Sequence, residues 1–426
     1  MTRSPRTNVR RLALGRLISV TGGAAAYTAL NFIVWDRTHS PFMQALSLLL
    51  TFGVAGLLGP LAGALGDHFD RRIVMIWSEA IGAAFFAAMA FAHAPLLLIL
   101  LAFGSAIAEL PFFSASRAAI PNLVECEEDL AWANSLITMG VHSGIAVGPV
   151  IGGLLVGTLG SSWVFAINAG TFVVSLLITL TVRASFQEAR TEADRAAHGG
   201  FLAGVSYLWR EPVLRRLSIA WLVFVLGMGM GMVADAPVAA SFDSGGLGFG
   251  LLIACWGTGS VLGTACGRWM NERTEPPILV AGSAGIAITA FAVGFAPIFP
   301  LVLAALLAMG ICDGLSIVAE NGIMQRRTPD AVRSRTMAAF EAVLSLGLAL
   351  AYMAAGPALR LVDDPQIIYV IGGVFAVVST IILVPLVAGR RRIGAPVPVV
   401  STAPPEPVPV GEAVQETTER LVAPGA

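Results

Sequence analysis

The chain has 426 residues, of which 56% are hydrophobic and only 12% are charged, and its mean hydropathy is +0.79. A soluble domain carries roughly 25% charged residues, because water must wet its surface. So few charges cannot cover a globule of this size in water, and we expect most of the surface to face lipid. The net charge of −1 supplies no basic face for nucleic acid.

Twelve apolar runs are long enough to cross a membrane. A span needs about 20 apolar residues to cross a hydrocarbon layer of roughly 30 Å. The runs are 12–35, 42–65, 73–92, 95–115, 135–159, 162–182, 213–237, 245–270, 277–296, 297–320, 334–358 and 366–388. Backbone groups in lipid must bond within their own segment, so we predict an all-α integral membrane protein with twelve transmembrane helices.

The arginines fix an expected orientation. With the N-terminus in the cytoplasm, nearly every arginine lies on the cytoplasmic side, as the positive-inside rule requires, and Arg37 and Arg360 are the exceptions. Six spans then precede the charged loop 183–212 and six follow it, so both termini are predicted to be cytoplasmic. The chain contains no lysine and is rich in Ala, Gly, Val and Leu, which is typical of a high-G+C bacterial genome. We therefore predict the bacterial cytoplasmic (inner) membrane.

The charged loop also sets the predicted domain boundaries. Residues 1–182 form an N-terminal six-helix bundle, 183–212 a cytoplasmic linker loop and 213–390 a C-terminal six-helix bundle. The tail 391–426 is rich in proline and has too little apolar content to pack, so we expect it to be disordered.

The two halves resemble each other in the order of their small residues. The recurring features are Gly59-x3-Gly63 and Gly259-x3-Gly263 at an offset of 200, and then Pro121 and Pro329, and Gly148-Pro149 and Gly356-Pro357, at an offset of 208. Because each half has an even number of spans, the two halves share one orientation. This predicts two parallel six-helix pseudo-repeats around a central cavity that opens to each side in turn.

A charged loop between the second and third spans carries a recognisable pattern. It begins at Gly63 and continues through Asp67 to Arg71 and Arg72. The pattern resembles the G-x-x-x-D-R-x-G-R-R signature of the major facilitator superfamily and departs from it at His68 and Asp70. The resemblance implies a cytoplasmic gate made by Gly63, Asp67, Arg71 and Arg72, in which carboxylate and guanidinium groups hold neighbouring helices together. The alternative is an ordinary positive-inside loop.

The fifth span contains Gly148, Pro149, Gly152 and Gly153, which resembles the G-P-x-x-G-G element of superfamily exporters. Close helix packing by small residues is the alternative explanation. Further blocks, such as 117–124, 165–169 and 325–335, resemble the enterobactin-exporter-like and macrolide-efflux-like branch, and the resemblance covers roughly residues 10–390. It implies a monomeric secondary transporter with a small-molecule substrate.

Several ionisable residues lie inside the apolar runs, where a charge costs about 3 kcal/mol. Asp313 and Glu109 lie deepest, and the offset of 208 places Glu109 opposite Ile317, one helical turn from Asp313. We predict that Asp313, Glu109 and Glu79 are proton-coupling or cavity residues, with hydrogen bonding to a neighbouring helix as the alternative. Arg16 and Glu320 are interpreted as residues that reach the cytoplasmic surface, and Asp235 as a residue near the outer end of its span.

No pattern of a catalytic or metal site appears. The four cysteines and five histidines have neither zinc-site nor disulfide spacing, and no Ser/His/Asp or phosphate-loop pattern is present. We expect no metal, no cofactor and no enzyme activity. The sequence thus favours a proton-coupled exporter of a lipophilic or amphipathic small molecule, such as a drug, antibiotic or siderophore-like metabolite. A nutrient importer of the same fold remains open, and a membrane-embedded enzyme or receptor is less favoured.

Overall fold

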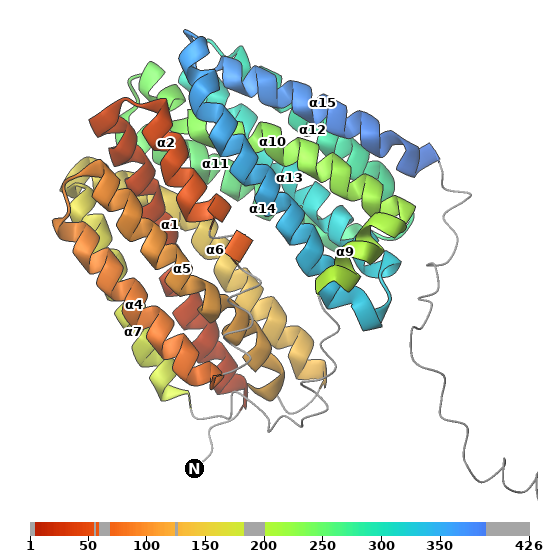
Figure 1. Cartoon of the computed structure of the whole chain (residues 1–426), viewed down its shortest axis with the longest axis horizontal. Coiled ribbons are helices and arrows are strands. Elements are labelled where there is room, and N and C mark those ends of the chain that lie inside the picture. Colours follow the sequence, from red (N-terminus) through yellow and green to blue (C-terminus); the bar gives the residue numbers. More distant parts are fainter. Residues whose placement is uncertain (1–4, 55–56, 59–68, 124–126, 183–200, 389–426) are drawn as a thin grey trace, which may run out of the picture. The chain divides into compact units, whose positions relative to one another are not determined.

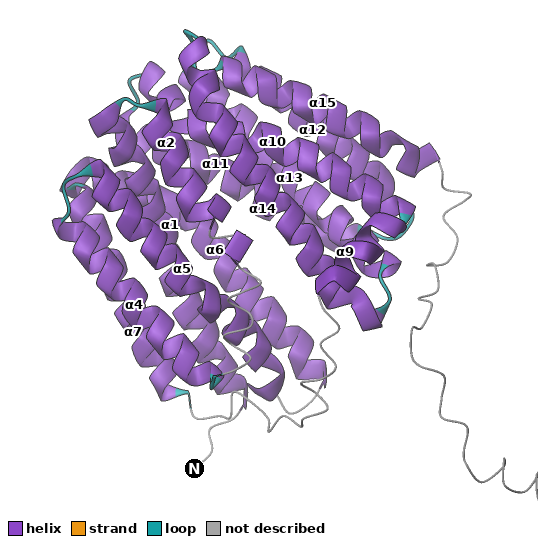
Figure 2. Ribbon diagram, in the orientation of Figure 1, coloured by secondary structure: helices purple, strands orange, loops and turns teal. Residues whose placement is uncertain are grey.

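The computed structural model describes residues 5–54, 57–58, 69–123, 127–182 and 201–388, and these residues form helices and short connections without any strand (Figures 1 and 2). In chain order the first half contains α1 (Pro5–Thr38), α2 (Pro41–Leu48), the π-helix η1 (Leu49–Val54), α4 (Arg71–Phe91), α5 (Pro95–Ala119), the 3₁₀ turn η2 (Ile120–Leu123), α6 (Glu127–Leu159) and α7 (Ser161–Thr181). The second half contains α9 (Phe201–Arg210), α10 (Pro212–Ser241), α11 (Gly245–Ala265), the 3₁₀ turn η3 (Cys266–Trp269), α12 (Glu275–Gly294), α13 (Phe299–Arg327), α14 (Asp330–Leu361) and α15 (Ile367–Ala388).

Eleven of the helices in the described part are long and apolar enough to cross a membrane. A shorter apolar helix, Pro41–Val54, occupies the place of the predicted second span, and the rest of that span lies mostly outside the described residues. The prediction of an all-α membrane fold is confirmed. The helices extend beyond several predicted ends. For example, α10 continues through Pro237 to Ser241, because proline removes one backbone hydrogen bond without ending a helix packed on its neighbours.

The outer face of the bundle is apolar, as lipid contact requires. Phe91 is 81% exposed, Ile288 69% and Ile381 63% when the protein is considered alone. Side chains of this kind do not face water in such numbers on a soluble protein. Their place on the outside of the helices therefore marks the surface that lipid tails cover.

The helices of the two halves pack in matching pairs. In the first half α1 packs on α6 and α7, while α4 packs on α5 and α7. In the second half α10 packs on α14 and α15, while α12 packs on α13 and α15. Each pair in one half corresponds to the pair six spans later, so the helix packing has the two-repeat arrangement that the sequence predicts.

The repeated glycines of the second half form a close helix contact. A Cβ atom added at Gly259 would lie 3.0 Å from Cα of Gly310, and one added at Gly263 would lie 3.0 Å from the backbone nitrogen of Leu315. Side chains larger than hydrogen would push α11 and α13 apart. The corresponding Gly59 and Gly63 of the first half lie outside the described residues.

The two halves meet through α6 with α11 and through α2 and η1 with α14. In the first contact a Cβ at Gly153 would lie 3.0 Å from Cα of Gly250, and in the second a Cβ at Gly356 would lie 3.5 Å from Cα of Phe42. These approaches lie in the later parts of α6 and α14. They are therefore at the end of the bundle away from the start of α1, and the ribbons of the halves separate toward the start of α1 (Figure 1).

The predicted linker 183–212 contains a short helix. α9 packs on α14, and the Tyr207 hydroxyl donates a hydrogen bond to the Arg327 carbonyl at 2.8 Å. Glu211 then caps α10, because its Oε2 accepts from the backbone N–H of Leu214 at 2.6 Å. Residues 183–200 and the tail 391–426 lie outside the described residues, so the predicted domain boundaries and the predicted disorder remain predictions.

Candidate functional site: a central cavity between the halves

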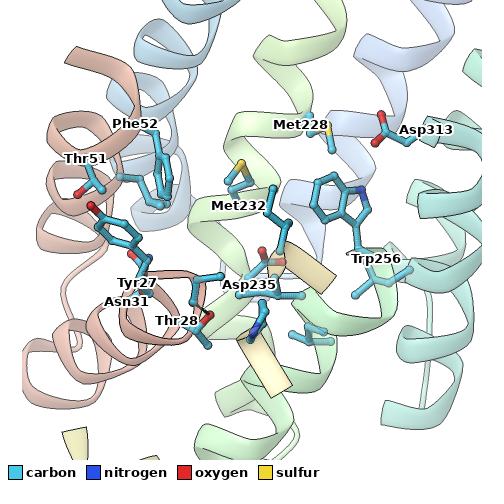
Figure 3. A pocket seen from close by; sticks show the side chains of 18 of the residues that line it. Tyr27, Thr28, Asn31, Thr51, Phe52, Met228, Met232, Asp235, Trp256 and Asp313 are labelled. Atoms are coloured by element: carbon cyan, nitrogen blue, oxygen red, sulfur yellow. Dashed lines mark hydrogen bonds between the residues drawn. The ribbon is translucent and has the colours of Figure 1, made fainter. Parts of the chain in front are cut away.

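A cavity of about 580 Å³ lies between the two halves. Its walls come from α1, α2, η1, α5 and α6 of the first half and from α10, α11, α12, α13 and α15 of the second. Figure 3 shows side chains of both halves, including Tyr27 and Asp235, around the same space. The volume is within the range of about 300–1,000 Å³ that small-molecule sites occupy.

The lining is mostly apolar and is rich in aromatic and methionine side chains. Phe224, Phe249 and Trp256 line one side, together with Met228 and Met232. Methionine adapts its shape to irregular ligands, and aromatic rings offer large flat contacts. The charged groups in the lining are one guanidinium, Arg16, and three carboxylates, Glu109, Asp235 and Asp313. The cavity therefore suits an amphipathic guest whose polar part meets a carboxylate.

Glu109 brings a carboxylate to the first-half wall of the cavity. Its Oε1 accepts a hydrogen bond from Ser105 one turn earlier on α5, at 3.2 Å, and the Tyr27 hydroxyl of α1 forms a second side-chain bond. Both partners are fixed on packed helices. The carboxylate is thus held at the cavity wall and away from lipid.

Glu79 and Arg16 are buried within the first half and do not lie at its surface. Glu79 is 2% exposed and its Oε1 accepts from Ser175 on α7 at 2.8 Å, while Arg16 is 5% exposed. The Arg16 guanidinium lies 4.8 Å and 4.5 Å from the ring centres of Phe112 and Phe113. The interpretation of Arg16 as a surface-reaching residue is therefore wrong, because aromatic stacking and nearby carboxylates compensate its burial. Glu320, which is 6% exposed, is likewise not a surface residue.

Asp313 and Asp235 supply the carboxylates of the second half. Asp313 on α13 is 3% exposed and bonds to the Ser260 side chain of α11. Asp235 on α10 accepts a hydrogen bond from the Tyr369 hydroxyl of α15. Asp235 lies in the last two turns of α10, near the end of its span as the sequence indicates, and it also lines the cavity.

The Gly-Pro element of α6 packs in two directions. A Cβ at Gly148 would lie 2.6 Å from the Thr21 carbonyl oxygen of α1, and one at Gly152 would lie 2.8 Å from Cα of Ala25. Gly153 instead faces α11, and Pro149 lines the cavity. Close packing accounts for all three glycines. Their link to the direction of transport remains a prediction.

The gate predicted between the second and third spans is described in part. Gly63 and Asp67 lie outside the described residues. Arg71 is 8% exposed, and Arg72 Nη2 donates to the Leu180 carbonyl oxygen of α7 at 2.9 Å. Asp70, a departure from the signature, caps α4 because its Oδ1 accepts from the backbone N–H of Arg72 at 2.8 Å.

The Major Facilitator Superfamily family model matches residues 12–248 and 231–417. This chain belongs to the Major Facilitator Superfamily. The multidrug efflux pump Tap of Mycolicibacterium fortuitum is 26% identical over 381 residues, which are 84% of this chain and 90% of that protein. The enterobactin exporter EntS of Citrobacter koseri is 24% identical over 404 residues, which are 93% and 95% of the two chains. The resemblance proposed from the motifs is confirmed.

Solved structures show the same fold. The nucleoside transporter NupG superposes with a TM-score of 0.69 at 15% identity, covering 89% of this chain and 99% of that chain. A bacterial homologue of the human lysosomal transporter Spinster, in an inward-facing and unoccupied conformation, superposes with a TM-score of 0.66 at 16% identity, covering 91% and 96%. The solved structures show the fold, and the family match together with the named relatives identifies the chain as a transporter rather than an enzyme.

Two features of this superfamily member were missed from the sequence. The first is the Asp235–Tyr369 pair, although the offset of 208 places Asp235 opposite Tyr27, which bonds Glu109 in the other half. The second is an ion pair between Glu275 at the start of α12 and Arg326 at the end of α13. Among the described residues, no group of three or more His, Cys, Asp or Glu side chains could hold a metal ion.

Proposed function

We propose that this transporter exports a lipophilic or amphipathic small molecule from a bacterial cell in exchange for protons. It would act as a monomer in the cytoplasmic membrane, with both termini in the cytoplasm. The observation that carries the proposal is a central cavity with an apolar, Met-rich and aromatic lining and carboxylates on both walls. The relatives named as a multidrug efflux pump and an enterobactin exporter support export as the direction.

The orientation gives the described conformation a place in the transport cycle. With the start of α1 in the cytoplasm, the halves contact each other at the outer end and separate toward the cytoplasm. A cavity between halves in this arrangement receives its substrate from the inside, and rocking of the halves then exposes it to the outside. The alternative of an importer uses the same motion in reverse, so a transport assay has to decide the direction.

A carboxylate at cavity depth is the simplest carrier of the driving proton. One charge moved across 100 mV yields about 2.3 kcal/mol, which supports less than a hundredfold gradient of substrate. Asp313 is our first candidate because it is buried, lines the cavity and bonds to the neutral hydroxyl of Ser260. Glu109 and Glu79 are the candidates of the first half.

A susceptibility panel identifies a substrate first. A sensitive bacterial host with and without the protein is compared for ethidium, rhodamine 6G, macrolides and catecholate siderophores. The compound with the largest protection is then added outside everted membrane vesicles, and its uptake is followed while the vesicle interior is made acidic, so that protons leave as the compound enters. Protection against no compound, together with stimulated accumulation of nutrients in cells, would favour the importer.

The coupling group is tested by Asp313→Asn, with Asp363→Asn as the matched control on an exposed connection. We expect Asp313→Asn to abolish uphill efflux at every imposed gradient while binding of the same compound remains measurable, because the amide keeps the shape but cannot carry a proton. The control should pump like the parent protein. Normal pumping by Asp313→Asn would make Asp313 a packing residue and move the coupling to another carboxylate.

A further inference from the structure

Two buried carboxylates of the first half share one guanidinium. Arg16 of α1 is within electrostatic range of both Glu79 of α4 and Glu109 of α5. All three side chains line a second, small cavity of about 10 Å³ beside the central one. We call these three residues the Arg16 trio.

The Arg16 trio is not balanced in charge if both acids are ionised. Arg16 remains protonated in proteins and supplies one positive charge. Two carboxylates would leave the buried trio with a net charge of −1, and a buried charge without compensation is strongly unfavourable. One bound proton makes the trio neutral. Charge balance therefore calls for one protonated and one ionised carboxylate.

The neighbouring groups that bond the two glutamates are neutral, so they leave the charge of the trio unchanged. Of the titratable side chains described on α1, α4, α5 and α7, Tyr27 also faces it and bonds Glu109 as a neutral hydroxyl. Ser105 and Ser175 donate neutral hydrogen bonds to the two glutamates. The side chain of His142 on α6 lies outside the described part of the chain.

The two glutamates differ in their access to the central cavity. Glu109 and Arg16 line both cavities, whereas Glu79 lines the small one. The small cavity has room for about one water molecule, and its lining combines hydroxyl, carboxylate and guanidinium groups, which could bond a buried water, with two phenylalanine rings. A proton that reaches Glu109 from the central cavity thus has a short route to Glu79.

We propose that Arg16, Glu79 and Glu109 form a single binding site for one proton, in which Arg16 neutralises whichever glutamate is ionised. The site holds its proton at neutral pH before any substrate binds. Its role in transport rests on the proposed function, but its proton content does not. In an exchange cycle the proton leaves or enters through Glu109, and the net charge of −1 that its departure leaves on the trio has to be neutralised by the substrate. Arg16 is accordingly a positioning residue for the proton.

The proton content is measured by infrared spectroscopy on purified protein in lipid, without substrate. Protonated carboxyl groups have a carbonyl stretch that ionised ones lack, and difference spectra against the parent protein cancel the other acids. We expect Glu79→Gln to lose the whole signal of the site, and Glu109→Gln to lose the same amount, because Arg16 neutralises the one carboxylate that remains. Arg16→Met should raise the signal about twofold, because both acids then need a proton.

Two arginine variants separate charge from packing. Arg16→Lys keeps the positive charge and should give the parent signal. Arg37→Met removes an exposed guanidinium from the end of the same helix and should also change nothing. If Arg16→Met does not fold, the two glutamine spectra decide. The proposal is overturned if either glutamine variant keeps the parent signal, or if a folded Arg16→Met does not increase it. If the spectra are as expected but the protein shows no proton-driven efflux, the proposed function is refuted and the proton site is not.

Discussion

The contact between Gly153 of α6 and Gly250 of α11 should control which end of the protein is closed. A Cβ at Gly153 would lie 2.7 Å from the carbonyl oxygen of Gly246 and 3.0 Å from Cα of Gly250. These atoms belong to the backbone and cannot turn aside as a side chain can. Gly153→Ala must therefore separate the two helices where the halves meet, which destabilises the described conformation relative to one with this end open.

The expected size of the shift follows from the cost of overpacking. Forcing one extra carbon into a well-packed contact costs about 1–3 kcal/mol. Such a change shifts an equilibrium between two conformations by about fivefold to more than a hundredfold. Alanine also gains about 1 kcal/mol of helix propensity over glycine, but this gain is common to both conformations because α6 is helical in each.

The assay is a distance measurement between spin labels at Phe42→Cys and Leu361→Cys, on α2 and α14 across the same end. Their side chains are 55% and 86% exposed, so labels fit without disturbing the core. We expect Gly153→Ala to increase the long-distance population. Gly157→Ala is the matched control on α6, since its added Cβ has nothing within 4 Å. Identical distance distributions for both variants would refute the role of this contact.

Three other predictions concern the cavity, the second-half ion pair and the topology. Tyr369→Phe should weaken binding of a transported compound by about two- to tenfold, because a hydrogen bond contributes about 0.5–1.5 kcal/mol and this one holds Asp235 in place. An unchanged dissociation constant would show that this bond does not contribute to binding. Glu275→Gln should lower the melting temperature in detergent by a few degrees because it removes the ion pair with Arg326. The control Glu272→Gln, at an exposed position, should leave the melting temperature unchanged. Equal melting temperatures of the two variants would show that the ion pair does not contribute to stability. In a cysteine-free protein, a cysteine introduced at Asp363 should react with an impermeant thiol reagent added to intact cells, and one introduced at Glu272 should not. The reverse labelling pattern would contradict the predicted orientation.

The membrane fold was predictable because lipid imposes one rule on every span. Each stretch must be apolar and must satisfy its own backbone, so composition and run length locate the helices. The ends were less predictable. Pro237 lies within α10, and the second span begins as α2 and changes to a π-helix at Leu49–Val54. Such details depend on packing against neighbours, which a single sequence does not display.

The sequence indicated Asp313 and Glu109, which line the cavity, but not their hydrogen-bond partners, and the role of these acids in coupling stays a prediction. Depth along a span indicated Asp313 and Glu109, because a costly charge in the membrane must have a reason to be there. The position of Arg16 along its span could not show whether its side chain reaches the membrane surface or stays buried. The answer depends on Phe112 and Phe113, whose rings lie against the guanidinium. Pairing between distant helices is a tertiary property, and the internal repeat was the one signal in the sequence that pointed to it.

The unequal chemistry of the halves has a mechanistic consequence. In alternating access each half moves largely as a rigid body, so contacts inside a half persist while contacts across the cavity change. The bonds of Tyr27 with Glu109 and of Tyr369 with Asp235 are both inside a half. They cannot be the contacts that switch between the two states. In the proposed exchange cycle the contacts that change are therefore those across the cavity, where a substrate meets carboxylates of both halves.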